Sequence, residues 1–94
     1  MTVHFCHHSC EDALHAQVIT VSANDAVVFM GEGVYLMHKQ ACVQAIEAVG
    51  GCCYALAHDA KMRGVCLRPT VAGIKEADVV ELVIQHPRTF TWRV

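Results

Sequence analysis

Runs of consecutive apolar residues alternate along the chain with stretches in which apolar residues recur every three or four positions. A short unbroken run is typical of a strand, and the longer recurrence is typical of a helix that buries one face. Residues 26–30 are apolar throughout, the pattern of a strand buried on both faces of a parallel sheet. The pattern predicts strands at 3–6, 26–30 and 52–56, weaker candidates at 65–67 and 71–74, and strand propensity in the tail 89–94.

Helical spacing is clearest after the first strand, where Leu14, Val18 and Val21 fall on one face. Ser9 or Cys10 opens this helix, and acidic residues occupy its first turn, where the helix dipole favours them. The predicted helices run from residue 9 or 10 to a turn at 23–25, over 34–49 with an interruption near 38–40, over 58–63, and over 77–86.

This succession of strands and helices predicts an α/β fold. We expect a small, mostly parallel sheet covered by helices on both faces, formed by residues 1–94 as a single domain. In open sheets of this kind, functional groups gather at the carboxyl ends of the strands. The functional loops are therefore expected at residues 6–10, 31–33 and 56–59. The glycines of the second loop lack the rest of a phosphate-binding motif, and no cofactor is expected.

Apolar residues make up 54% of the 94 residues and charged residues only 17%. A small domain cannot bury all of these side chains alone, so a partner subunit is expected to cover the remainder. The net charge of −2 and the scattered cations give no reason to expect direct nucleic-acid binding. The longest apolar run is far shorter than the roughly 20 residues of a membrane span. No export signal is evident, so we expect a cytoplasmic chain with reduced thiols.

The densest group of reactive side chains lies at the end of the first predicted strand. Cys6, His7, His8 and Cys10 are residue types that bind zinc, but their spacing lacks the paired cysteines of a structural zinc site. On a strand, adjacent side chains also point to opposite faces. We therefore expect no metal and regard these four residues only as the metal ligands to consider.

Two cysteines are considered as candidate reactive thiols. Cys10 lies near a helix start, where unpaired N–H groups stabilise a thiolate, although the acidic residues beside it act in the opposite direction. Cys42 lies on the second predicted helix and is the weaker candidate. Cys52 and Cys53 should face opposite sides of their strand, and the thiols other than Cys10 are expected chiefly in the core.

Three stretches of the sequence, in this order and at this spacing, resemble the DsrH/TusB proteins of the DsrE-like superfamily. They are DAVVFMGEGVY at 25–35, CYALAHDAKMRGV at 53–65 and VVELVIQHPRTFTW at 79–92, and the opening MTVHFCHHS is also similar. The resemblance implies a DsrE-like subunit of a complex that relays sulfur as a protein persulfide. It further implies partners of the DsrE and DsrF or TusC and TusD type in a hetero-oligomer, or a homo-oligomer in isolation.

The chain departs from these proteins at two positions. The principal persulfide cysteine of such complexes corresponds to Leu56 here, and the first-helix cysteine of dissimilatory DsrH chains corresponds to Gln17. The resemblance therefore implies an accessory, TusB-like subunit serving 2-thiolation of the tRNA wobble uridine. Two alternatives stay open: a persulfide-carrying subunit in dissimilatory sulfur oxidation, acting through Cys10 or Cys42, and a small thiol-rich metal-binding or redox-sensing protein.

Overall fold

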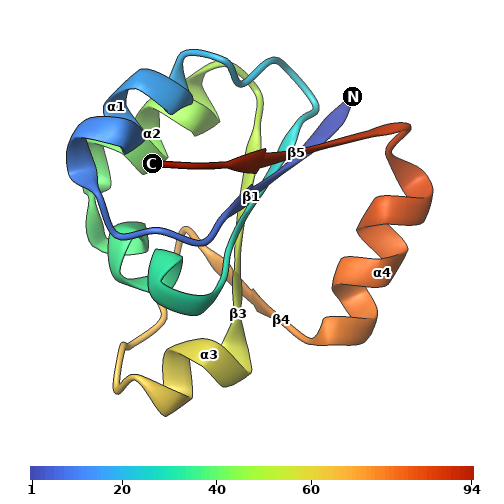
Figure 1. Cartoon of the computed structure of the whole chain (residues 1–94). Helices are drawn as coiled ribbons and strands as arrows, with labels where there is room; N and C mark the ends of the chain where they lie inside the picture. The colour runs from blue at the N-terminus through green and yellow to red at the C-terminus, as the bar shows by residue number, and fades with distance from the viewer.

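A wholly parallel sheet forms the centre of the chain. The computed structural model describes residues 1–94, and the spatial order of the strands is β4-β3-β2-β1-β5 (Figure 1). Every pairing between neighbouring strands is parallel, because a helical segment or a long connection returns the chain to the same edge before each new strand begins. The strands are β1 (Thr2–Cys6), β2 (Ala26–Phe29), β3 (Cys52–Leu56), β4 (Ala72–Ile74) and β5 (Arg88–Trp92).

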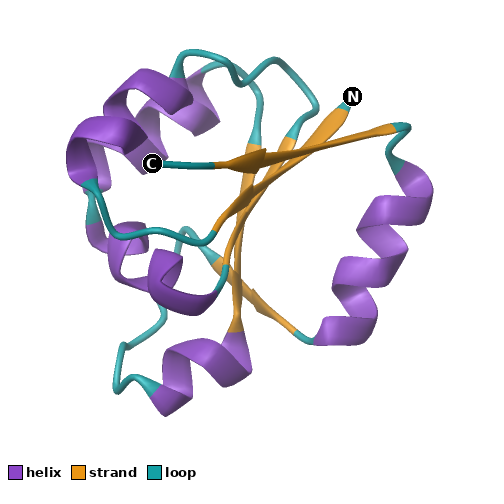
Figure 2. Ribbon diagram, viewed as in Figure 1, coloured by secondary structure: helices purple, strands orange, loops and turns teal.

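Helices cover both faces of this sheet, which confirms the predicted fold class. The helices α1 and α2 and the 3₁₀ helix η1 lie on one face, α4 lies alone on the other, and α3 continues beyond the end of β3 (Figures 1 and 2). Their bounds are α1 (Glu11–Val18), η1 (Gly31–His38), α2 (Gln40–Ala48), α3 (Ala57–Met62) and α4 (Glu76–Gln85). None of them combines the length and apolarity needed to cross a membrane.

The first helix ends earlier than its apolar spacing predicts. Helix α1 stops at Val18, although Val21 is still buried. Residues 19–21 are all β-branched, which disfavours helix. The hydroxyl of Thr20 also donates a 2.6 Å hydrogen bond to the carbonyl of Gln17, in competition with the helical hydrogen-bond ladder.

The second helical stretch is divided as predicted, at Lys39, whose backbone is not helical. It begins earlier than predicted, however, because residues 31–33 form the first turn of η1 instead of a break. Gly31 enters this turn with a φ of +56°, a conformation that glycine adopts without strain. The N–H of Gly33 then donates to the carbonyl of Met30 at 2.9 Å, which closes the turn.

The strand expected at residues 65–67 is wrong, and the candidate at 71–74 is confirmed as β4. The N–H of Val65 closes the end of α3 by donating to the carbonyl of Ala60 at 2.9 Å. The carbonyl of Cys66 accepts a hydrogen bond from the ring of His38 at 2.9 Å. Because these backbone groups have local partners, the segment does not pair with the sheet, and β4 takes the edge beside β3.

The chain crosses the whole sheet between its last two strands. Strands β1 to β4 are laid down side by side, and the connection through α4 then places β5 on the free side of β1. The strand predicted in the tail of the chain is therefore confirmed, and it forms one edge of the sheet. The larger apolar core lies between the sheet and α1, η1 and α2, whereas a smaller cluster around Val3, Ala26 and Val28 lies beneath α4.

Candidate functional site

The three loops predicted from the sequence meet at the carboxyl edge of the sheet. The N–H of Met30, after β2, donates to the carbonyl of Cys6 at the end of β1, at 3.0 Å. The N–H of Gly31 donates to the Asp59 carboxylate, in the first turn of α3, at 2.7 Å. Residues 6–10, 31–33 and 56–59 are thus held together by hydrogen bonds, and this edge is the candidate site.

A close approach between the first two loops depends on a glycine. A side-chain carbon at Gly33 would overlap the carbonyl oxygen of Cys6. Only glycine lets η1 begin directly over the end of β1. Gly33, which is not part of a phosphate-binding motif, therefore has a packing role at this edge.

Asp59 acts differently from a simple helix cap. Its sequence position suggests a first-turn acid of a short helix, but α3 has no side-chain cap, and the carboxylate crosses to Gly31 in the neighbouring loop. Because it accepts the N–H of Gly31, the Asp59 carboxylate fixes the first residue of η1 relative to α3. Sequence reasoning missed this role because the two residues are far apart in the chain.

His8 connects the first loop to the last residues of the chain. Its Nδ1 accepts a hydrogen bond from the N–H of Cys10 at 3.1 Å, so Nε2 carries the proton and donates to Oε1 of Gln17 at 2.6 Å. The Gln17 amide in turn donates to the carbonyl of Arg93 at 2.7 Å. Both ring nitrogens of His8 and both ends of the Gln17 amide are therefore engaged within the protein.

The four residues considered for a metal site do not converge. Cys6 is fully buried in the core, and its thiol is 3.6 Å from the carbonyl of His8. His7 is exposed, both ring nitrogens of His8 have partners, and Cys10 is half-buried. The structure contains no group of three or more His, Cys, Asp or Glu side chains placed to hold a metal ion.

Three of the six thiols are buried, and all six are free. Burial raises the pKa of Cys6 to about 11, and the hydrogen bond with His8 offsets this only in part. Burial raises the pKa of Cys53 to about 12, with a smaller contribution from the charges of Glu47 and Cys52. A thiol with such a pKa stays protonated at neutral pH and cannot act as the attacking thiolate.

Cys42, one of the two candidate carriers, lies between α1 and α2. Its sulfur is 3.7 Å from Nδ1 of His15, and Lys39 forms an ion pair with Glu11 nearby. Burial raises the pKa of the Cys42 thiol, the charge of Glu11 raises it further, and the charge of Lys39 lowers it. The candidate thiol is therefore buried and held in its protonated form.

The remaining three thiols reach solvent. Cys52 and Cys66 are exposed, so the expectation that they lie in the core is wrong, and Cys10 is half-buried. Cys52 begins β3 and so lies at the amino edge, opposite the candidate site. The buried neighbour Cys53 confirms that the adjacent cysteines face opposite sides of the strand. Cys10, in the first loop, is the solvent-reaching thiol among the three loops at the carboxyl edge.

The residue at the end of β3 is not a thiol. Leu56 is buried there, immediately before α3. No thiol follows it in the loop 56–59. The carboxyl edge is thus a junction of three loops in which Leu56, and not a thiol, occupies the end of β3.

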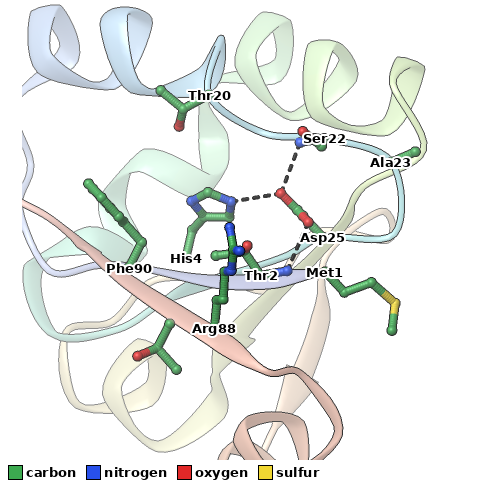
Figure 3. Close-up of a pocket in the computed structure, with 10 residues that line it drawn as sticks. Met1, Thr2, His4, Thr20, Ser22, Ala23, Asp25, Arg88 and Phe90 are labelled. Carbon is green, nitrogen blue, oxygen red and sulfur yellow. Dashed lines mark hydrogen bonds and ion pairs between the residues drawn. The ribbon is translucent and has the colours of Figure 1, made fainter.

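A pocket of about 450 Å³ opens at the amino edge and was not predicted (Figure 3). Nε2 of His4 donates to the Asp25 carboxylate at 2.9 Å on its inner wall. The Nδ1 atom of His4 accepts the indole N–H of Trp92 at 3.1 Å. Every buried polar side-chain atom of the structure has a hydrogen-bond partner, so the buried His4 and Asp25 side chains serve to link strands.

Asp25 is the electrostatic centre of this pocket. Burial acts to raise the pKa of its carboxyl, but hydrogen bonds from the His4 ring and from the N–H groups of Ser22 and Thr2 outweigh it. The pKa of Asp25 therefore lies below its ordinary value. The carboxylate holds β1, β2 and the turn before β2 together.

Comparison with known proteins agrees with this architecture. The model of the family described as DsrH like protein matches residues 8–89 of the chain. The match begins within the first loop of the carboxyl edge, includes the other two loops and α4, and ends at the second residue of β5. No curated protein matches the sequence.

Proposed function

The chain belongs to the DsrH family of sulfur-relay subunits, and from this premise we propose that it is an accessory, TusB-like subunit of a persulfide-transfer complex. In this role it holds a sister subunit whose cysteine carries the sulfur. The complex would serve 2-thiolation of the tRNA wobble uridine. Residues 1–94 would act as one domain in the cytoplasm, where thiols stay reduced.

The observation that carries the proposal is the absence of a thiol at the end of β3. Persulfide transfer needs a thiolate that can reach the terminal sulfur of a donor. Leu56 occupies this place and is buried. Cys6, at the end of β1, is also buried, and its pKa of about 11 keeps it protonated. In the proposed role, a partner would supply the sulfur-carrying cysteine.

Gln17 supports the TusB-like assignment over a dissimilatory one. This position corresponds to the first-helix cysteine of dissimilatory DsrH chains. Here the amide of Gln17 bridges His8 and the carbonyl of Arg93. A residue that joins α1 to the two ends of the chain has a structural task, and it offers no sulfur chemistry.

The partners would be DsrE- and DsrF-like or TusC- and TusD-like chains in a hetero-oligomer. The net charge of −2 agrees with a subunit that contacts other proteins and not tRNA. Sulfur would pass between thiols of the partners, and this chain would fix their geometry.

A reconstituted relay tests the proposal. The chain is co-expressed with the DsrE- and DsrF-like or TusC- and TusD-like chains of the same genome, and the complex is incubated with a cysteine desulfurase and cysteine. Native mass spectrometry should show one assembly that contains this chain. Peptide mass spectrometry should find the added mass of one sulfur atom on a sister subunit and none on this chain. A chain that stays outside every assembly would contradict the proposal.

The second candidate function is a persulfide carrier, favoured by the half-buried Cys10 at the carboxyl edge. The same experiment separates the two. A sulfur adduct on the peptide that contains Cys10, lost in Cys10→Ser, would replace the accessory role with the carrier role. An adduct on Cys42 would do the same and would require that α1 and α2 open.

A separate measurement distinguishes tRNA thiolation from sulfur oxidation as the pathway that the complex serves. Deleting the gene should lower the level of 2-thiouridine at the wobble position, measured by nucleoside mass spectrometry. Complementation with Cys10→Ser should restore it, because an accessory subunit needs no carrier thiol. Unchanged 2-thiouridine together with impaired sulfur oxidation would favour the dissimilatory pathway.

A further inference from the structure

The pocket at the amino edge lies where no helix covers the sheet. Strand β5 is the last element of the chain, so no helix follows it, and α1 already ends at Val18. The connection from α1 to β2 forms one wall of the pocket through Thr20 and Ser22, and the first residues of β1 and β5 form the opposite wall. Its volume of about 450 Å³ is in the range of pockets that bind small molecules.

The side chains on the sheet side of the pocket come from two paired strands. In the register of β1 and β5, Thr2 pairs with Arg88 and His4 pairs with Phe90. Paired residues of neighbouring strands point to the same face, and so do residues two positions apart on one strand. Arg88, His4 and Phe90 therefore share one face of the sheet, and all three line the pocket.

Two opposite charges line this pocket without forming an ion pair. Arg88 is exposed and pairs with no carboxylate of the chain. Asp25 is ionised at neutral pH, because the pKa of its carboxyl lies below the ordinary value. Figure 3 shows the Arg88 side chain extending from β5 toward the His4–Asp25 pair. The guanidinium is therefore directed into the pocket and is free to bind an anionic group.

The Asp25 carboxylate has room for one further hydrogen bond. Its Oδ2 atom accepts hydrogen bonds from the ring of His4 and from the N–H of Ser22. Its Oδ1 atom accepts one from the N–H of Thr2. Each carboxylate oxygen has about two acceptor positions. Asp25 lines the pocket although it is only 4% exposed, so Oδ1 is the atom that a cationic donor in the pocket would reach.

Phe90 adds an apolar surface beside the two charges. Its side chain is 60% exposed, and its ring lies 6.4 Å from the His4 ring between centroids. Residues two positions apart on a strand are separated by about 7 Å, so Phe90 lies within the reach of a small ligand held by Arg88. An exposed aromatic ring at a pocket wall favours an apolar or aromatic group of the ligand.

We propose that this pocket binds a small α-amino acid with an apolar or aromatic side chain. The ligand carboxylate would pair with the guanidinium of Arg88, whose planar fork matches a carboxylate. The ligand ammonium would donate to Oδ1 of Asp25, and the ligand side chain would cover Phe90. The site lies at the edge of the sheet opposite the three loops, and it does not rest on the accessory role.

The two charges favour a zwitterion over a simple ion. A dianion such as phosphate would pair with Arg88, but the ionised Asp25 would repel it. A cation alone would be attracted by Asp25, but Arg88 would repel it. In an α-amino acid both charges are attached to the same carbon, so one small molecule meets both side chains.

The first test uses a series of probes on the full chain. L-phenylalanine and L-leucine are titrated against the protein, and two-dimensional NMR follows the backbone amides and the indole N–H of Trp92, which reports on His4. We expect a Kd of about 1 mM, as for a small ligand in an open pocket. The compounds 3-phenylpropionate, phenethylamine and glycine lack the ammonium, the carboxylate and the side chain, respectively. Each should bind at least about 10-fold more weakly than L-phenylalanine.

The second test removes the guanidinium. Arg88→Gln should raise the Kd for L-phenylalanine at least about 10-fold, because a neutral amide replaces a charge-assisted pair. Arg93→Gln is the matched control, since Arg93 is also exposed near the end of the chain but does not line the pocket. It should bind as the parent does. Circular dichroism checks that both variants keep the fold.

The outcomes separate the ligand class from the site. Binding of 3-phenylpropionate as tight as that of L-phenylalanine, and lost in Arg88→Gln, would show a simple anion site and overturn the amino-acid assignment. Signals that do not change with either amino acid at about 10 mM, well above the expected Kd, would overturn the site. Equal binding by the parent and by Arg88→Gln would overturn it as well. None of these results affects the accessory role, because no sister subunit takes part in the measurements.

Discussion

The indole N–H of Trp92 donates a 3.1 Å hydrogen bond to Nδ1 of His4, and the two rings lie 5.5 Å apart between their centroids. This pair joins β5 to β1, the two neighbouring strands that are farthest apart in the sequence. Because Nδ1 of His4 accepts from Trp92, Nε2 must carry the proton toward Asp25. Trp92 therefore sets the tautomer of the histidine through which β1 is joined both to β5 and to Asp25, directly before β2.

Trp92→Phe should destabilise the fold by about 2 kcal/mol, because it leaves the buried Nδ1 atom of His4 without a donor. Urea unfolding followed by circular dichroism measures the change. Phe90→Leu is the control, since Phe90 lies on the same strand but is 60% exposed. That variant should change the free energy of unfolding by less than about 0.5 kcal/mol. Equal effects of the two variants would contradict the role of the hydrogen bond.

Acid should unfold the chain partly through Asp25. The pKa of this carboxyl is lower in the folded chain than its ordinary value, so its stabilising effect is complete above its unfolded pKa of about 4. The effect is lost as the pH falls through the lower, folded pKa. Stability measured from about pH 7 to about pH 3 should therefore decline below about pH 4.

Asp25→Asn tests the assignment of this acid response. The variant should lose about 2 kcal/mol at neutral pH, because a neutral amide is a weaker acceptor for the N–H groups of Thr2 and Ser22. It should also show a flatter decline in acid than the parent. If the variant and the parent decline with the same slope, another carboxylate controls acid unfolding.

Gly33→Ala should cost about 3 kcal/mol, because the added methyl group would overlap the carbonyl oxygen of Cys6 and force the backbone to move. Gly64→Ala is the comparison. Gly64 has a φ of +66° and open space around it, so its substitution should cost roughly 1–2 kcal/mol from backbone strain alone. Thermal and urea unfolding of both variants measure the difference. A larger loss for Gly64→Ala would contradict the close approach of η1 to β1.

Iodoacetamide should alkylate the six thiols at rates that depend on their burial. In the native chain Cys52 and Cys66 should be alkylated first and Cys10 more slowly. The other three, Cys6, Cys42 and Cys53, should react only after denaturation, since burial raises the pKa of each. Peptide mass spectrometry over time gives the order. Native labelling of Cys42 as fast as that of Cys52 would show that α1 and α2 separate readily.

Local patterns predicted the strands and helices well because most of them have local causes. The unbroken apolar run at residues 26–30 marks β2, whose residues are all buried, and the second helical stretch divides at Lys39 within the predicted interval 38–40. The parallel arrangement followed from the alternation of element types. The position of β5 could not be predicted in this way, because it depends on a pairing between residues at opposite ends of the chain.

The candidate site was predicted in its loops but not in its contacts. The carboxyl ends of β1, β2 and β3 meet as the parallel topology requires. The bond between Asp59 and Gly31, and the chain of hydrogen bonds from His8 through Gln17, join residues whose proximity no local pattern encodes. Which thiols are exposed and which are buried could not be predicted for the same reason, since burial depends on the complete fold.

The late arrival of β5 has a consequence for synthesis of the protein. Until residues 88–92 emerge from the ribosome, β1 has a neighbour on one side only and offers an open row of backbone donors and acceptors. A stalled or truncated product that ends before Arg88 would keep this row exposed and would lack Trp92. Such fragments are expected to aggregate through the open edge of β1.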